Sequence, residues 1–213
     1  GAAVPEVWLT AFSNLFLEGG LAAGQTVLIH AGASGVGTAA IQLAAAAGAR
    51  VAVTAGAEAK LAHCRALGAQ VAVNYRRDSF AARLQEIGGV DLVLDCVGGP
   101  YLADHLRLLN PGGRLVIIGL MGGRRAEIDL VPVLGKSLRV IGSRLRARPL
   151  EEKIAITRAF RERFWPGLAR GQLTPVIDRV FPITAAAEAH AYVKANRNIG
   201  KVILAVGPAA DAG

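Results

Sequence analysis

The 213-residue sequence predicts an α/β fold, a doubly wound parallel sheet of six strands with helices on both faces. Short apolar runs of strand length alternate with segments of helical length along residues 26–143. The runs are apolar throughout, which is typical of parallel strands that helices cover on both sides. A glycine-rich turn separates the first run from the helix that follows it, as in Rossmann folds that bind dinucleotides.

The expected strands are residues 26–30, 50–54, 71–74, 91–96, 113–119 and 137–143. The expected helices are one that runs from the glycine-rich turn to Ala47 and three over residues 58–67, 78–87 and 101–109. Gly68 is a natural C-terminal stop for the second helix, and Asn110–Gly113 ends the fourth. Outside this unit, an apolar helix is expected over 3–17, and a strand, a helix (184–196) and a strand over 179–206.

This reading divides the chain into five segments. They are a helix between domains (1–18), a Rossmann core (19–150), a helical connection (151–178), a C-terminal unit (179–206) and a disordered tail (207–213).

Composition narrows the class of protein. The chain is 53% hydrophobic and 5% aromatic, which predicts a well-buried aliphatic core. It has no uninterrupted apolar run long enough for a membrane span and no charged segment typical of a signal peptide. Cys64 and Cys96 lack metal-binding spacing and fit a reducing compartment, so we expect a cytoplasmic protein without disulfides.

A net charge of +8 fits either a solvated arginine-rich surface or attraction of an anionic ligand, such as a phosphorylated cofactor or a nucleic acid. No run of five like charges occurs, so a nucleic-acid-binding arm is not indicated.

The strongest motif is IHAGASGVGTAAIQLA over residues 29–44. Gly32 permits the tight turn and Gly37 permits close packing of the helix on the strand. The free amides at the helix start favour a pyrophosphate, so Ser34, Gly35, Val36 and Gly37 are expected to bind it. Ser34 stands where the usual pattern has its middle glycine, and the absence of Gly-Lys-Ser/Thr excludes a P-loop.

The end of the second strand indicates which dinucleotide binds. An NAD site has an acid there, whereas this chain reads Thr54-Ala55-Gly56-Ala57. Lys60 and Tyr75 are placed to hold a 2′-phosphate, although Glu58 is an opposing charge nearby. NADPH is therefore the expected cofactor, with Gly56, Ala57, Lys60 and Tyr75 around its phosphate.

Together these residues resemble the zinc-free NADPH:quinone oxidoreductase branch of the medium-chain dehydrogenase/reductase superfamily, and within it the stress-inducible, apoptosis-linked type. The strings that carry the resemblance are PEVWLTAF, VLIHAGASGVGTAAIQLA, LGAQVAVNY, LDCVGG, GGRLVIIGLMGG, VIGSRLRAR and ANRNIGKVIL. They span nearly all of residues 4–206, and LMGG with NRNIGKV is fairly specific. The serine at position 34 is also a feature of that branch.

The resemblance implies further cofactor contacts. Thr10 would lie near the nicotinamide; Cys96, Val97 and Gly98 would pass the adenosine; Gly119, Leu120 and Met121 would back the nicotinamide; Ser143 and Leu145 would lie beyond; and Asn198 would close over the cofactor. It also implies a homodimer through the outer strand, residues 137–145, whose apolar edge invites pairing.

Family members carry a further N-terminal region that forms most of a GroES-like catalytic domain. Residues 179–206 then resemble a remnant of that domain, and this chain resembles the cofactor-binding half. We expect residues 1–213 to bind NADPH but to reduce quinones far more slowly than a full-length relative.

The expected activity is hydride transfer from NADPH to quinones or related conjugated carbonyls. The alternatives are an enoyl-thioester reductase, an NADPH-binding regulatory or RNA-binding module, and an inactive fragment. No catalytic acid or base is assigned, and the scattered His30, His63, His105 and His190 are expected to be structural. No metal site is expected, because the chain has no cysteine cluster.

Overall fold

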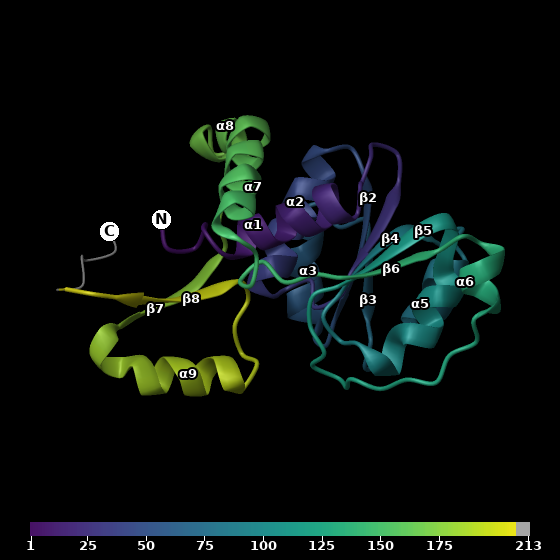
Figure 1. Cartoon of the computed structure of the whole chain (residues 1–213). Helices are drawn as coiled ribbons and strands as arrows, with labels where there is room; N and C mark the ends of the chain where they lie inside the picture. The colour runs from purple at the N-terminus through teal and green to yellow at the C-terminus, as the bar shows by residue number, and fades with distance from the viewer. Residues whose placement is uncertain (208–213) are drawn as a thin grey trace.

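The computed structural model describes residues 1–207 and confirms the α/β fold. Its main sheet has six parallel strands in the order β3-β2-β1-β4-β5-β6 (Figure 1). This is the strand order of a doubly wound dinucleotide fold. The strands are β1 (Thr26–Ile29), β2 (Arg50–Ala55), β3 (Val71–Asn74), β4 (Val90–Asp95), β5 (Leu109–Ile117) and β6 (Arg139–Gly142).

The crossover helices follow the expected positions, with shorter ends. They are α2 (Gly35–Ala46), α3 (Glu58–Ala66), α4 (Phe80–Gln85) and α5 (Leu102–Leu108). Two elements were not predicted: a 3₁₀ turn over Gly99–Tyr101 and the short helix α6 (Val131–Gly135). The strand β5 begins at Leu109 and so includes the four residues expected to form a turn. Leu109 pairs with Val90, and the register then shifts before the regular part of the strand.

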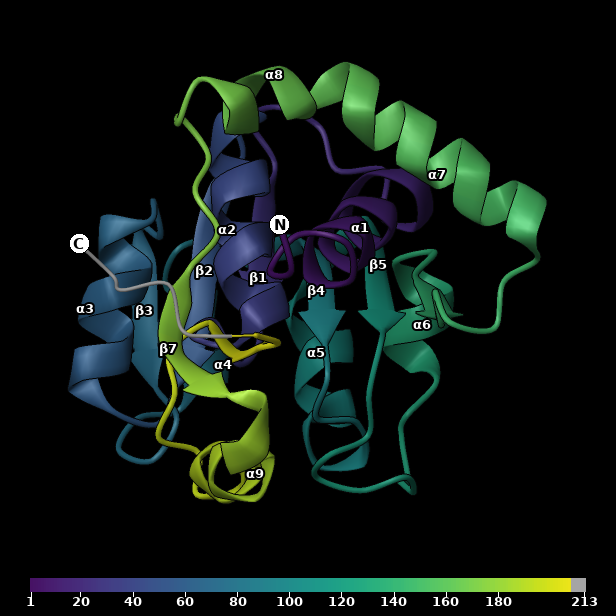
Figure 2. The ribbon, with the colours of Figure 1, turned by 90° about the vertical axis from the view of Figure 1, so that its left-hand side faces the viewer.

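An aromatic cluster packs the N-terminal helical segment against the helices that follow the main sheet. The N-terminal helix α1 (Val7–Phe12) continues as a π-helical segment (Ser13–Glu18), and α7 (Leu150–Arg163) and α8 (Trp165–Ala169) follow the sheet. The rings of Phe12 and Phe160 lie 5.7 Å apart at 67°. Figure 2 shows α7 and α8 passing over α1 and the end of α2. Four of the six phenylalanines, Phe12, Phe16, Phe160 and Phe164, pack in this cluster.

Two apolar cores lie on the two faces of the sheet. Alternate residues of β1 divide between them, with Val27 and Ile29 in one core and Leu28 in the other, all fully buried. The first core contains side chains of α1, α2, α3 and α7, and the second contains side chains of α4 and α5. Burial of strands on both sides explains why the sequence shows continuous apolar runs.

The C-terminal unit pairs its own two strands. It consists of β7 (Ile177–Pro182), a 3₁₀ turn (Ile183–Ala185), α9 (Ala186–Lys194) and β8 (Lys201–Ala205), with β7 and β8 parallel. It lies beside the main sheet rather than within it (Figure 1). The Gly200 amide donates a 2.8 Å hydrogen bond to the Ala33 carbonyl, which joins this unit to the glycine-rich loop.

No helix among residues 1–207 is both long and apolar enough to span a bilayer. The disordered tail expected over 207–213 falls, apart from residue 207, outside the described residues.

Candidate functional site

The glycine-rich loop leads from β1 into the first turn of α2. Ser34 caps this helix, because its Oγ accepts a hydrogen bond from the Gly37 amide at 3.0 Å. Such a cap satisfies one free amide of a helix start and leaves the others available to an anion. The serine in the position of the middle glycine is therefore compatible with pyrophosphate binding.

Gly37 determines how closely α2 approaches the turn after β1. A Cβ at this position would lie 2.4 Å from the Ala31 carbonyl oxygen and 2.5 Å from that of Gly32. Both are backbone atoms that cannot easily move aside, so we expect Gly37→Ala to lower the free energy of unfolding by about 1–3 kcal/mol, the usual cost of overpacking. Urea denaturation followed by circular dichroism measures the change.

Gly135→Ala is the matched control, because a Cβ there has no neighbour within 4 Å. It should unfold like the wild-type protein. An unchanged denaturation midpoint for Gly37→Ala would show that the loop is not held as described.

A cavity of about 540 Å³ lies beside this loop, which is a size typical of small-ligand sites. Its walls come from the segments that follow β1, β2 and β4 and from the C-terminal unit. β1 and β4 are neighbours at the point where the strand order reverses, and doubly wound sheets bind ligands there. The lining residues are Ala31, Ala33, Ser34, Thr54, Ala55, Gly56, Lys60, Tyr75, Val97, Tyr101, Met121, Gly122, Val193, Asn196 and Asn198.

Seven residues proposed from the sequence line this cavity. They are Ser34, Gly56, Lys60, Tyr75, Val97, Met121 and Asn198. They come from separate segments of the chain, so the fold gathers them at one place.

A second cavity, of about 750 Å³, lies where the sequence places the nicotinamide end. The expected residues Gly119, Leu120 and Ser143 line it. Arg148 also lines it and was not predicted; its guanidinium bonds the Glu18 carboxylate and, at 3.3 Å, Ser143 Oγ. This ion pair joins the end of the N-terminal helical segment to the loop after β6.

The other proposed residues line neither cavity. They are Thr10, Gly35, Val36, Gly37, Ala57, Cys96, Gly98 and Leu145. Gly35, Val36 and Gly37 belong to the first turn of α2, where backbone amides rather than side chains would meet a phosphate. Thr10 is buried in α1, and its hydroxyl donates a long 3.4 Å hydrogen bond to Glu6. Cys96 lies behind Gly119. A Cβ added at Gly119 would lie 3.2 Å from the Cys96 carbonyl oxygen.

The region around Gly56 is strongly basic. A Cβ on Gly56 would lie 2.7 Å from Tyr75 Oη and 3.1 Å from Arg76 Nε, so both side chains pass over this glycine. Lys60 Nζ donates two 2.8 Å hydrogen bonds to Asn196, one to its carbonyl and one to its side-chain oxygen. Partial burial lowers the pKa of Lys60, while nearby Asp178 acts to raise it.

The sequence analysis did not identify Arg76 as part of this region. The only indication of it in the sequence is a positive charge next to Tyr75. Glu58, the opposing charge noted above, is 61% exposed and pairs with Arg65 at 2.7 Å. Its carboxylate is therefore already neutralised by a partner outside the cavity lining.

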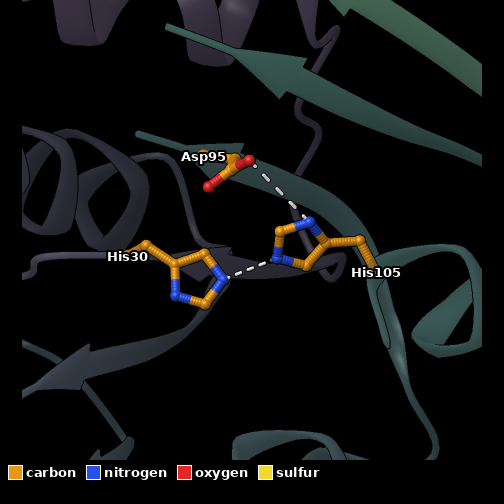
Figure 3. Close-up of side chains that lie close together, drawn as sticks. All are labelled: His30, Asp95 and His105. Carbon is orange, nitrogen blue, oxygen red and sulfur yellow. Dashed lines mark hydrogen bonds and ion pairs between the residues drawn. The ribbon is translucent and has the colours of Figure 1, made fainter. Parts of the chain in front are cut away.

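One expectation about the histidines was wrong. His30 and His105 are not scattered, because their Nε2 atoms lie 2.8 Å apart beneath the first cavity, with Asp95 beside them (Figure 3). They come from the turn after β1 and from α5, and only the pairing of β1 with β4 brings these segments together. Sequence spacing carried no sign of this cluster.

The strand order, the capped glycine-rich loop and the cavity at the switch point define a Rossmann-type dinucleotide-binding unit. The chain belongs to the zinc-binding dehydrogenase family, whose model matches residues 35–160. This confirms the resemblance to medium-chain dehydrogenases/reductases.

The spectinabilin polyketide synthase system protein NorB of Streptomyces orinoci is 40% identical over 99% of this chain and 9% of its own length. The rat (Rattus norvegicus) quinone oxidoreductase is 30% identical over 96% of this chain. This chain spans 61% of the length of that protein.

Two solved structures have the same fold. A quinone oxidoreductase from Thermus thermophilus, whose complex with NADPH is also known, has a TM-score of 0.85 and 36% identity over 96% of this chain and 65% of that one. The CurK enoyl reductase has a TM-score of 0.81 and 29% identity over 97% of this chain and 62% of that one. The relatives are therefore oxidoreductases of more than one substrate class.

Proposed function

We propose that this chain is the cofactor-binding part of an NADPH-dependent oxidoreductase that transfers hydride to quinones or related conjugated carbonyls. The observation that carries the proposal is the basic site around Gly56, where Lys60, Tyr75 and Arg76 meet. None of the residues that line the first cavity is acidic, so no carboxylate there opposes a 2′-phosphate. The NADPH complex of the Thermus relative supports the same choice of cofactor.

The arrangement assigns a task to each part of the site. The adenosine end of the cofactor would occupy the first cavity, with its pyrophosphate on the amides of Gly35 and Val36, because the Gly37 amide already bonds Ser34. The nicotinamide end would lie toward the second cavity, which Gly119 and Leu120 line. NADPH supplies a hydride when bound. The residues of this chain bind and orient the cofactor, and none of them is assigned as a proton donor.

The proposal includes a cytoplasmic setting and no role for zinc. Cys64 and Cys96 are both free, and burial raises the pKa of each thiol to about 11. Neither thiol belongs to a cysteine cluster of the kind that holds a structural zinc ion.

An enoyl-thioester reductase is the second candidate. The similarity to a polyketide synthase system protein and to the CurK enoyl reductase favours it. The two candidates share the cofactor site and differ in the substrate, which touches the second cavity and the region beyond it.

Steady-state NADPH oxidation distinguishes the candidates. The substrates are a small para-quinone and a crotonyl thioester, each tested with residues 1–213 and with the same chain joined to the N-terminal region of a quinone oxidoreductase relative. We expect the joined protein to prefer the quinone and the shorter chain to be far slower, because Leu120, which lines the second cavity, is 52% exposed without an opposite wall.

Preference of the joined protein for the thioester would favour the second candidate. Equal turnover by the two proteins would show that residues 1–213 already hold the whole active site. Failure of residues 1–213 to bind NADPH would contradict the proposed function itself.

We also propose a homodimer through the outer strand β6. Within the described residues β6 pairs only with β5, and its Val140 side chain is 48% exposed. An open strand edge with apolar side chains favours pairing with a second copy. We expect light scattering at high micromolar concentration to report a dimer, and Val140→Lys to shift it toward monomer.

Val180→Lys is the control for the dimer, since Val180 is similarly exposed but lies in β7. A monomeric wild-type protein, or equal dissociation by both variants, would argue against pairing through residues 137–145.

A further inference from the structure

Four buried polar side chains form a row beneath the first cavity. Thr54 Oγ1 lies 2.8 Å from His30 Nδ1, and His30 Nε2 lies 2.8 Å from His105 Nε2. His105 Nδ1 lies 3.9 Å from the Asp95 carboxylate, beyond hydrogen-bond distance, and has no hydrogen-bond partner within the described residues. Figure 3 shows the two imidazoles joined to each other, with the Asp95 carboxylate above them and facing the second ring nitrogen of His105.

All four side chains are almost completely shielded from water. The exposed fraction is 0% for Asp95 and His105, 1% for Thr54 and 3% for His30. A buried polar group without a hydrogen-bond partner is costly, so the protons in this cluster must be arranged to satisfy its members together.

The Asp95 carboxylate determines that arrangement. Its oxygens already accept hydrogen bonds from the Val97 amide at 2.7 Å and the Gly98 amide at 3.0 Å. An ionised carboxylate can only accept, and a neutral imidazole has one donor and one acceptor nitrogen. We expect His105 to carry its proton on Nδ1, because a lone pair on this nitrogen would face the negative charge of Asp95 at 3.9 Å.

The other protons follow from this one. His105 Nε2 becomes an acceptor, and His30 Nε2–H donates to it. His30 Nδ1 is then an acceptor as well, and the Thr54 hydroxyl donates to it. In this arrangement both hydrogen bonds of the row point from Thr54 toward His105, and the two histidines are opposite tautomers.

The two ends of the row lie at the carboxyl ends of β2 and β4, next to the segments that form the walls of the cavity. Thr54 itself lines the cavity at the end of β2, two residues before Gly56. At the other end, Asp95 holds the amide of Val97, which lines the facing wall. Tyr101, another lining residue, lies with its ring 5.0 Å from the ring of His30.

We propose that His30 and His105 are positioning residues that hold the carboxyl ends of β2 and β4 at the separation required by the adenosine end of the dinucleotide. This inference rests on the proposed function, since it assigns the cavity to NADPH. It concerns a part of the cofactor that NADPH and NADH share, which separates it from the role of Lys60.

The surroundings of the pair keep it neutral. The titratable groups that face it are Asp95, Cys96, Tyr101 and Asp104. Burial lowers the pKa of both histidines, and Asp104 acts to raise that of His105. With both imidazoles neutral near pH 7, the shared Nε2–H···Nε2 hydrogen bond is intact.

A metal ion is the competing explanation for this cluster, because His30, Asp95 and His105 place ligand atoms within 4.8 Å of one another. The direct 2.8 Å contact between the two Nε2 atoms argues against it. Two nitrogens bound to one tetrahedral zinc ion, at the usual bond lengths, lie about 3.4 Å apart.

The test compares cofactor affinity in variants of the whole chain. His105→Leu removes both ring nitrogens, and His105→Gln keeps an acceptor near the position of Nε2. His190→Leu, on an exposed surface of α9, is the control. Dissociation constants for NADPH and NADH are measured by fluorescence titration at a temperature where circular dichroism shows each variant to be folded.

We expect His105→Leu to weaken NADPH and NADH binding by the same factor, about five- to tenfold, which corresponds to one lost buried hydrogen bond. His105→Gln should recover part of the affinity, and His190→Leu should bind like the wild-type protein. Unchanged affinity for both cofactors in folded His105→Leu, or a loss confined to NADPH, would overturn the inference.

The proton arrangement has its own spectroscopic test in the wild-type protein. In ¹⁵N-labelled protein at pH 7, we expect long-range ¹H–¹⁵N spectra to show His30 protonated on Nε2 and His105 protonated on Nδ1. Matching tautomers, or one metal ion per chain by elemental analysis, would overturn the inference. If the wild-type protein binds neither cofactor, the proposed function fails, whereas these spectra test the histidine row alone.

Discussion

Replacing Lys60 by alanine is expected to weaken NADPH binding by about 1–3 kcal/mol, or roughly 5- to 150-fold, and to leave NADH binding nearly unchanged. Lys60 belongs to the lining of the first cavity, near Gly56. A charged hydrogen bond to the 2′-phosphate is the interaction that the variant would lose. In the structure the Lys60 ammonium group donates two 2.8 Å hydrogen bonds to Asn196, so the phosphate must compete with Asn196 for this group.

Titrating both cofactors against wild-type protein, Lys60→Ala and Arg83→Ala provides the measurement. Arg83→Ala removes one positive charge from α4, where Arg83 is 61% exposed and pairs with Glu86, so it should not change either affinity. A similar loss for NADPH and NADH in Lys60→Ala would rule out the phosphate role of this residue. If Lys60→Ala still preferred NADPH to NADH, Tyr75 and Arg76 would be the residues that hold the phosphate.

Lowering the pH from 6.5 to about 4 is expected to reduce the free energy of unfolding by about 3 kcal/mol through His105. Burial lowers the pKa of His105 from 6.5 to about 4. Over this interval the unfolded chain binds a proton on the imidazole while the folded chain does not, so stability falls as the pH falls. Below about pH 4 both states are protonated and the loss levels off.

Two neighbours modify the profile. Burial also lowers the pKa of His30, which adds a loss of the same sign. Burial raises the pKa of Asp95, so the folded state protonates this carboxyl first and gains some stability at the acid end. Urea denaturation at several pH values, on wild-type protein, His105→Leu and the control His190→Leu, separates these effects.

As the pH falls, the free energy of unfolding of His105→Leu should decrease less steeply than that of the wild-type protein. The difference in slope should correspond to nearly one proton. Parallel profiles for these two proteins would show that His105 is not buried in its neutral form. His190→Leu should follow the wild-type profile.

Local patterns were sufficient to predict most of the fold. The parallel sheet follows from continuous apolar runs, since only strands covered on both faces are apolar throughout. The glycine-rich loop follows from its position between a strand and a helix. Boundaries were less certain where tertiary pairing overrides turn chemistry, as at Asn110–Gly113, which the pairing of Leu109 with Val90 draws into β5.

The sequence by itself also determined that β2 ends without an acid and that Lys60 and Tyr75 follow in the next segments, since these are local facts. What only the tertiary structure decided is which distant side chains meet. Arg76 over Gly56 and the row from Thr54 to Asp95 bring together segments that the sheet order places side by side, and helix packing brings Arg148 to Glu18. The physical reason is that hydrogen bonds and ion pairs depend on separations in space, which sequence periodicity does not encode until the strands are paired.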